Sequence, residues 1–149
     1  MSLNERINED IKNAMKNKEQ FKLGVIRGIK GAIQLAKIEA KRDLTDDEVI
    51  NVISKQIKMR KDSIAEFTKA NRDDLVNQYE EEILILNEYM PEQLSFEEVE
   101  KIIDDAFSEI NPTSMKDMGQ IMKIVSPKIN GKYDKGEVSK IIKDKLSNL

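Results

Sequence analysis

The residues that most often carry out catalysis are missing from this 149-residue chain, which contains neither histidine nor cysteine. Without them the chain cannot build a thiol nucleophile, a Ser–His–Asp triad, a zinc finger or a haem-binding histidine. Acidic residues remain in adjacent groups at 73–74, 80–82 and 104–105. Neighbouring residues on a helix point in different directions, so these groups do not converge on one ion or substrate. We therefore expect no catalytic residue, no metal site and no cofactor.

Three glycines, Gly24, Gly28 and Gly31, fall within a segment that has the periodicity of a helix. Each should cost such a helix about 0.5–1 kcal/mol relative to alanine. A phosphate-binding loop would need a preceding strand and a following Lys-Ser or Lys-Thr pair, and neither is present. Small residues instead recur at every fourth position, at Gly24, Gly28, Ala32, Ala36 and Ala40. We expect this strip to let the backbone of another helix approach closely.

Arg60 interrupts an apolar row that continues through Ile57 and Ile64. One interpretation is an arginine at the margin of the row, whose charged end reaches water. The other is an arginine paired with a carboxylate of the following acidic segment, such as Glu80 or Glu82. The sequence leaves both interpretations open.

Lysine dominates the end of the chain, because residues 113–149 contain eight lysines, four acidic residues and no arginine. Lysine is a hydrated point charge that suits contact with the phosphates of a nucleic acid, whatever its base sequence. Without arginine we expect no base-specific reading of DNA. Tyr133 is the one aromatic residue of this region that could stack on a base. The candidate RNA-binding residues are Lys116, Lys123, Lys128, Lys132, Lys135, Lys140 and Lys143.

Charge varies strongly along the chain. Residues 1–71 carry 15 basic and 11 acidic side chains. Residues 72–112 carry two basic and 13 acidic side chains, and residues 113–149 carry eight basic and four acidic side chains. The net charge of −3 therefore conceals an acidic middle between two basic flanks. Helix faces of opposite charge that pack against one another within the protein would explain this pattern. A basic flank that binds a phosphate-bearing partner would explain it as well.

The elements that must position these residues are helical, because apolar residues recur at three- and four-residue spacing and no segment alternates as a strand does. A hydroxyl residue followed three positions later by glutamate predicts helix starts at Ser2, Thr45 and Ser95. Pro91 predicts the end of one helix, and Pro127 followed by Asn130-Gly131 predicts a turn. We expect an all-α protein with about four helices in residues 1–92 and a smaller three-helix bundle in residues 93–149.

A cytoplasmic location is expected from two absences. The first residues lack the apolar run of a secretory leader. No stretch has the roughly 18 consecutive apolar residues of a membrane span, so we expect no membrane association.

Five motifs, in this order along the chain, resemble the YqeY family. They are TDDEVI at 45–50, RKDSI at 60–64, EYMPEQL at 88–94, SMKDMG at 114–119 and GEVS at 136–139. This family shares its domain with the tail of the B subunit of the glutamine-dependent aspartyl/glutamyl-tRNA amidotransferase. The resemblance covers essentially the whole chain and implies an all-helical fold with a larger N-terminal and a smaller C-terminal part.

In the amidotransferase this tail is non-catalytic and touches the body of the tRNA. The resemblance therefore implies a module that binds tRNA or another structured RNA and has no activity of its own. Two alternatives stay open. One is a protein-interaction adaptor that uses Met115, Met118, Met122 and the strip of small residues. The other is an accessory component of a carbon–nitrogen ligase that takes its amide from glutamine.

Overall fold

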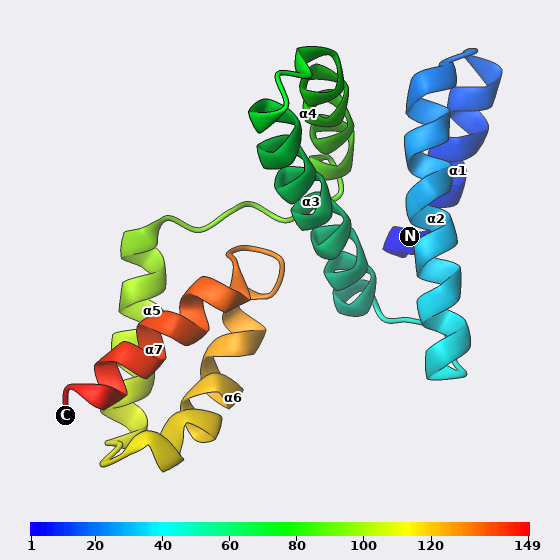
Figure 1. Ribbon diagram of the computed structural model, residues 1–149. Coiled ribbons are helices and arrows are strands. Elements are labelled where there is room, and N and C mark those ends of the chain that lie inside the picture. Colours follow the sequence, from blue (N-terminus) through cyan, green and yellow to red (C-terminus); the bar gives the residue numbers. More distant parts are fainter. The chain divides into compact units, whose positions relative to one another are not determined.

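The computed structural model describes residues 1–149 and contains seven α-helices, one short 3-10 helix and no strand (Figure 1). The prediction of an all-α fold is confirmed. The chain divides into two compact units, Met1–Met90 and Pro91–Leu149. The elements are α1 (Leu3–Lys16), α2 (Gln20–Ala40), α3 (Asp46–Lys69), α4 (Asp73–Asn87), α5 (Phe96–Ile110), η1 (Met115–Asp117), α6 (Met118–Ile129) and α7 (Lys135–Ser147).

The helix starts follow the capping residues seen in the sequence. Ser2 and Thr45 each accept a hydrogen bond from the backbone N–H three residues later, and the glutamate at that position accepts one from the cap backbone in return. Ser95 accepts from the backbone N–H of Glu98 at 3.1 Å. There the Glu98 carboxylate accepts from the Ser95 hydroxyl, at 3.2 Å. All three caps satisfy backbone donors that the first helical turn leaves free.

The turn after α6 lies at Asn130-Gly131, as predicted, but it does not begin at Pro127, because the helix continues through Pro127 to Ile129. Proline removes one backbone donor, which weakens a helix at that point. Ile129 is fully buried and continues the apolar row of Ile121 and Val125. The packing of this row outweighs the missing hydrogen bond, and the chain turns only at Gly131, whose φ is 72°.

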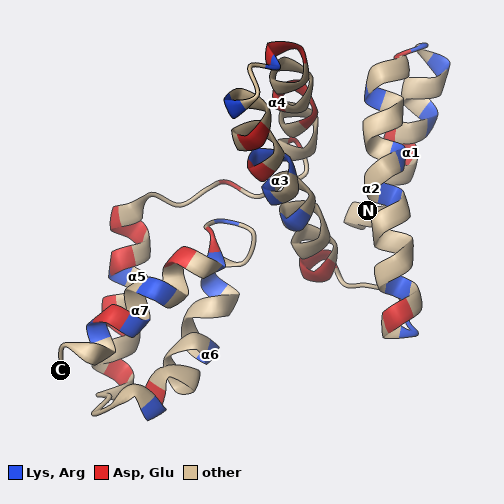
Figure 2. Ribbon diagram, viewed as in Figure 1, with Lys and Arg blue, Asp and Glu red and all other residues tan.

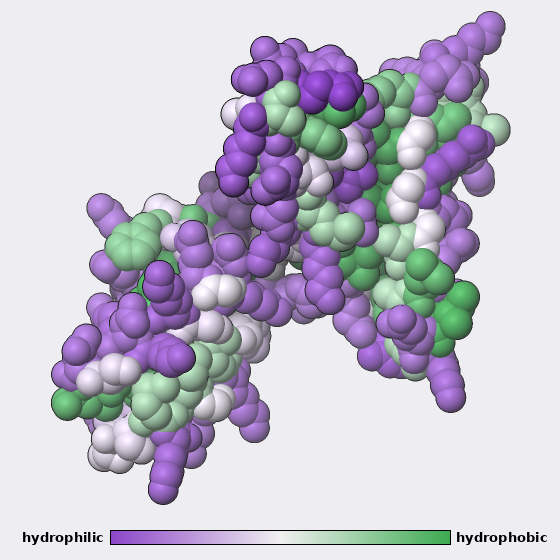
Figure 3. Space-filling model, viewed as in Figure 1, coloured by the Kyte–Doolittle hydropathy of each residue, from purple (hydrophilic) through white to green (hydrophobic).

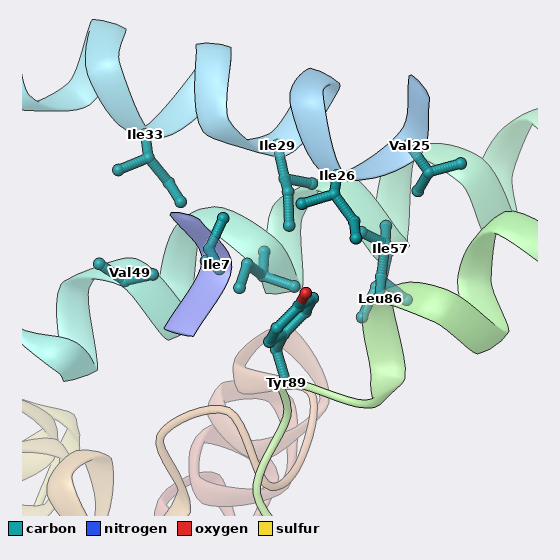
Figure 4. Packing of buried hydrophobic residues seen from close by; sticks show 10 residues of the cluster. Ile7, Val25, Ile26, Ile29, Ile33, Val49, Ile57, Leu86 and Tyr89 are labelled. Carbon is teal, nitrogen blue, oxygen red and sulfur yellow. The ribbon is translucent and has the colours of Figure 1, made fainter. Parts of the chain in front are cut away.

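The core of the N-terminal unit draws on all four of its helices, with α2 packed against the other three. Ile7 of α1, Ile26 and Ile29 of α2, Ile53 of α3 and Leu86 of α4 have no exposed surface. Figure 4 shows most of these side chains converging between the helices. Burial of such residues is the main source of stability for a unit of this size.

Polar contacts add to this core at the end of α4. The Tyr89 hydroxyl donates to Asp10 Oδ2 at 2.5 Å, and the Arg6 guanidinium lies 4.9 Å from the centre of the Tyr89 ring. Arg6 Nη2 also donates to the carbonyl of Glu88 at 3.1 Å. Burial and the nearby Asp10 carboxylate raise the pKa of the Tyr89 hydroxyl above its usual range. These contacts fasten α1 to the last residues of the N-terminal unit.

Arg60 pairs with Glu82, which decides between the two interpretations that the sequence left open. Arg60 Nε lies 3.2 Å from Glu82 Oε1, and the two side chains are only 17% and 12% exposed. Arg60 Nη1 donates to both the carbonyl and Oε1 of Gln56, and Gln78 Nε2 donates to Glu82 Oε2. The network joins α3 to α4 beyond the apolar core, where the rings of Phe67 and Tyr79 also meet edge to face, with their centroids 5.4 Å apart.

The strip of small residues on α2 does not pack as expected. A Cβ atom built at Gly24, Gly28 or Gly31 meets no other atom within 4 Å. No other helix of the N-terminal unit approaches the backbone of α2 at these positions, because the buried face of α2 is the opposite one, formed by Ile26, Ile29 and other apolar residues.

Candidate nucleic-acid interface

The C-terminal unit is a bundle in which α6 packs against both α5 and α7. Its buried core consists only of apolar side chains. They are Val99, Ile103 and Ala106 of α5, Ile121, Val125 and Ile129 of α6, and Val138, Ile142 and Leu146 of α7. Each helix buries one side in this core, so its polar residues are left on the outside.

The turn between α6 and α7 is tied to the segment that precedes α5. The backbone N–H of Leu94 donates to the carbonyl of Lys132 at 2.9 Å. Gln93 Nε2 donates to the carbonyl of Gly131 at 2.8 Å. At the start of α7, Asp134 Oδ1 accepts from the backbone N–H of Gly136 at 2.8 Å. These bonds hold in place a turn that carries several of the candidate lysines.

Six of the seven candidate lysines are exposed, and Lys132 is half-buried. None of the seven forms an ion pair within the chain. Lys145, the eighth lysine of the region, differs because its ammonium group is paired with Asp104 of α5 and lies 5.9 Å from the Phe107 ring. The exposed candidates are Lys116, Lys123, Lys128, Lys135, Lys140 and Lys143.

The structure brings some of these lysines together and keeps others apart. Lys128, Lys132 and Lys135 all lie at the turn between α6 and α7. Lys116 lies in η1, before the opposite end of α6, and a 12-residue helix is about 18 Å long. Lys123 projects from the outer side of α6, away from its buried row. Lys140 and Lys143 lie three residues apart on α7. The lysines therefore form a main cluster of three at the turn and a pair on α7, and Lys116 and Lys123 are single charges.

Acidic residues concentrate on α5, which carries six of them and one lysine. Figure 2 shows them as red bands along α5, whereas blue and red alternate on α7. The acidic residues among the lysines of α7 are Glu137 and Asp144, with Asp134 just before the helix. The side of the bundle that α6 and α7 form is thus more basic than the side that α5 forms.

Tyr133 lies in the lysine-bearing turn but packs against the core of the bundle. Loss of hydration and the carboxylate of Glu137 raise the pKa of its hydroxyl. Its ring is half-buried, so only part of it is open to stacking with a base.

Among the three methionines of the adaptor hypothesis, Met118 and Met122 pack against the bundle core and Met115 is 40% exposed.

The sequence offered no reason to assign Gln93 a role, although its side-chain amide donates to the carbonyl of Gly131 and so helps to hold the lysine-bearing turn. Its only signal was its position within the motif at 88–94.

The structure contains no group of three or more acidic residues placed to hold a metal ion. None of its helices combines the length and the apolar character that a membrane crossing requires.

The family model described as "Yqey-like protein" matches residues 4–146. The chain belongs to the YqeY family. Three fungal relatives are each named "altered inheritance of mitochondria protein 41, mitochondrial". The protein of Pyrenophora tritici-repentis is 32% identical over 142 residues, which are 93% of this chain and 78% of that protein. That of Kluyveromyces lactis is 40% identical over 84 residues, 56% of this chain and 45% of that protein.

The third relative, from Vanderwaltozyma polyspora, is 31% identical over 120 residues, which are 75% of this chain and 64% of that protein. The match of this YqeY-family chain thus spans 78% of the Pyrenophora protein but about half of the Kluyveromyces protein.

The prediction of a cytoplasmic location is contradicted by these relatives, whose names place them in mitochondria. The prediction rested on the absence of an apolar leader and of a membrane span. These two absences do not separate cytoplasmic from mitochondrial proteins, because mitochondrial targeting segments are amphipathic and rich in arginine and lack an apolar run.

Proposed function

We propose that this YqeY-family protein binds structured RNA, with tRNA as the foremost candidate, through the lysines of its C-terminal unit. The observation that carries the proposal is the set of six exposed lysines without an ion-pair partner on α6, α7 and the segments beside them. A protein that neutralises phosphates with such groups releases the counterions condensed on the nucleic acid, and this release drives association.

The types of residue favour RNA over sequence-specific DNA. The narrow major groove of an RNA helix excludes side chains, so proteins recognise the helix through its backbone and its shape. Lysine supplies such contacts as a point charge, whereas the region lacks the arginines that read guanine in DNA. The half-buried ring of Tyr133 adds one possible stacking contact at the main cluster.

The acidic side of the bundle sets the orientation of the complex. Six carboxylates on α5 repel phosphate, so the RNA approaches the side formed by α6 and α7. Within that side, Lys128, Lys132 and Lys135 lie at the turn between α6 and α7, where we expect the main contact with phosphate.

The motifs at 88–94 and 114–119 support tRNA as the ligand through their resemblance to the tail of the amidotransferase B subunit. The chain itself performs no chemical step in this proposal. As an accessory part of a carbon–nitrogen ligase, it would hold tRNA for a separate catalytic subunit.

A binding titration of the full chain with fluorescently labelled bulk tRNA tests the proposal. A triple variant, Lys128→Gln with Lys132→Gln and Lys135→Gln, should raise the Kd at about 100 mM salt by about tenfold or more, because three phosphate contacts are lost. The matched control replaces Lys55, Lys58 and Lys61 of α3 by glutamine, which removes the same charge from exposed positions in the other unit.

The control variant should bind like the wild-type protein. Absence of binding by the wild-type chain at low salt would contradict the proposal. Equal loss of affinity in both triple variants would contradict it as well, because binding would then depend on total charge rather than on the lysine cluster.

A further inference from the structure

The outer face of α2 carries a continuous row of apolar and glycine residues that the N-terminal unit leaves largely uncovered. Over α2 the molecular surface changes from purple to white and green (Figure 3). The residues of this row, called the α2 seam below, are Phe21, Gly24, Gly28, Gly31, Leu35 and Ile38.

The spacing of the α2 seam is that of a helix–helix interface. Its members are separated by three, four, three, four and three residues, which keeps them on one line along the helix. An apolar row with a mean repeat of 3.5 residues faces a partner helix in coiled coils. The row has no such partner within the N-terminal unit, since nothing there approaches the glycines within 4 Å.

The exposure of the large residues makes this face unusual for an isolated monomer. Leu35 is 66% exposed, Ile38 is 71% exposed and Phe21 is 43% exposed. Between them lie three glycines that weaken the helix and gain no packing in return. A surface that is both apolar and open to close backbone approach fits a second helix.

We propose that the α2 seam is the interface between two copies of this chain, with their α2 helices packed antiparallel about a two-fold axis. The two-fold axis passes between Gly28 and Gly31, so the position numbers of facing residues add up to a constant. Phe21 then faces Ile38 of the second copy, and Gly24 faces Leu35 of the second copy. Gly28 faces Gly31 of the second copy at the point of closest approach.

The sizes of the facing residues support this register. Leu35 enters the space that Gly24 leaves open, and each such contact occurs twice because the interface is symmetric. A parallel pair would instead place Leu35 against Leu35 and Gly24 against Gly24. The large residues would then hold the helices apart and leave voids at the glycines, which costs packing energy.

The charges beside the seam are compatible with the same register. On the flank of the seam the position numbers of neighbouring residues add up to 61 instead of 59, which places Arg27 near Gln34 of the second copy and Gln20 near Lys41 of the second copy. No like charges face one another across these flanks, so the interface needs no ion to neutralise it.

The area that the seam can bury limits the affinity expected for the dimer. From residue 21 to residue 38 the helix extends about 27 Å. One pair of helices of this length lies at the lower end of specific interfaces, at about 1,200 Å² or less in total. The dimer should therefore be reversible, with a Kd in the micromolar range or weaker.

Sedimentation equilibrium of the full chain over a wide concentration range tests the proposal. The wild-type chain should change reversibly from monomer to dimer as its concentration rises. Gly28→Leu should raise the dimer Kd by about tenfold or more, because the added side chain prevents the close approach. The same change should leave the monomer folded, since a Cβ at Gly28 meets nothing within 4 Å.

The matched control is Gly119→Leu, at a glycine of α6 that is equally open. It should leave the dimer Kd unchanged, and circular dichroism should show both variants to have the helix content of the wild-type chain. A wild-type chain that stays monomeric at all concentrations would overturn the proposal in favour of a different occupant of the seam. A Gly28→Leu variant that dimerises as tightly as the wild type would also overturn it.

A second pair of variants tests the direction of the helices. Gln34→Glu should strengthen the dimer, because the new carboxylate faces Arg27 of the second copy, and Gln34→Lys should weaken it. In a parallel pair the same position would face Glu39, so the two effects would be reversed. The reversed result would overturn the antiparallel arrangement. The seam and the candidate lysines belong to different units, so the outcome is independent of RNA binding.

Discussion

The two units of the molecule use different means to hold their helices in place. The N-terminal unit supplements its apolar core with polar links between helices, such as Arg60–Glu82 and Tyr89–Asp10. The C-terminal unit buries nine apolar residues and no polar one. A polar link accepts only one partner geometry, whereas apolar contacts are non-directional. We infer that buried polar pairs fix the helix register of the N-terminal unit, whereas apolar packing fixes that of the bundle, whose one ion pair between helices, Lys145–Asp104, lies outside the core.

The largest effect is expected from truncating the two cores. Ile53→Ala in the N-terminal unit and Ile142→Ala in the C-terminal unit each remove a fully buried side chain. Each should lower the free energy of unfolding by about 2–5 kcal/mol, from lost burial and the cavity left behind. Hydrogen exchange read by mass spectrometry should show faster exchange only in the unit that carries the change. Equal acceleration in both units would mean that the two cores do not act separately.

A smaller effect is expected at the polar link between α3 and α4. Glu82→Ala leaves the half-buried guanidinium of Arg60 without its carboxylate. The free energy of unfolding should fall by about 1.5–3 kcal/mol, the range for hydrogen bonds that involve a charged group. Arg60→Met combined with Glu82→Leu should recover most of this loss, because apolar side chains of similar volume can replace a buried ion pair. Chemical denaturation of the three variants gives these values, and a double variant no better than Glu82→Ala would contradict this explanation.

Glycines should respond in opposite directions in the two units. Gly131 has a φ of 72°, so Gly131→Ala should destabilise the turn by about 1–2 kcal/mol. Gly24 lies in an open helix position, so Gly24→Ala should stabilise the monomer by about 0.5–1 kcal/mol. Thermal unfolding at a low protein concentration measures both changes. A destabilising Gly24→Ala would show that this glycine has a role within the monomer.

The smallest effect concerns the cap of α3. Arg42 donates to both carboxylate oxygens of Glu48 at 2.8 Å, and this interaction, with the Thr45 backbone, lowers the pKa of Glu48 from 4.5 to about 2. The pKa is lower in the folded state, so the charged carboxylate stabilises the fold at neutral pH. This stability is lost as the pH falls from about 4.5 to about 2. Glu48→Gln should therefore be less stable than the wild type at pH 7, with a difference that shrinks over that interval.

Between pH 5 and 8 the free energy of unfolding should stay nearly constant. The chain has no histidine, and its shifted acidic and tyrosine groups move away from this interval. Denaturation curves recorded at pH 5, 6, 7 and 8 check this expectation. A steep change between pH 6 and 7.5 would contradict it.

Local patterns predicted the helices well, because caps such as Thr45 and apolar spacing act within a few residues. Features that depend on distant residues were harder to predict. Glu80 and Glu82 were equal candidates for Arg60, and only the packing of α4 on α3 turns Glu82 toward it. The small residues of α2 predicted close packing by another helix, but the structure shows these glycines facing outward with nothing within 4 Å.

The candidate interface was predicted in composition but not in layout. Counting lysines identified a basic region, yet it could not show that Lys145 is paired with Asp104 or that Lys116 lies apart from the main cluster. Both facts follow from how α5, α6 and α7 pack. The sequence alone does not show which helix faces lie next to one another, so it could not predict this arrangement.

The salt dependence of tRNA binding tests the central proposal most directly. The logarithm of the association constant should fall linearly with the logarithm of salt concentration for the wild-type chain. The slope should become shallower by about 0.7–0.9 for each of Lys128, Lys132 and Lys135 replaced by glutamine. The α3 control with Lys55, Lys58 and Lys61 replaced should keep the wild-type slope. An unchanged slope in the triple variant of the lysine cluster would show that these residues do not contact phosphate, and would contradict the account.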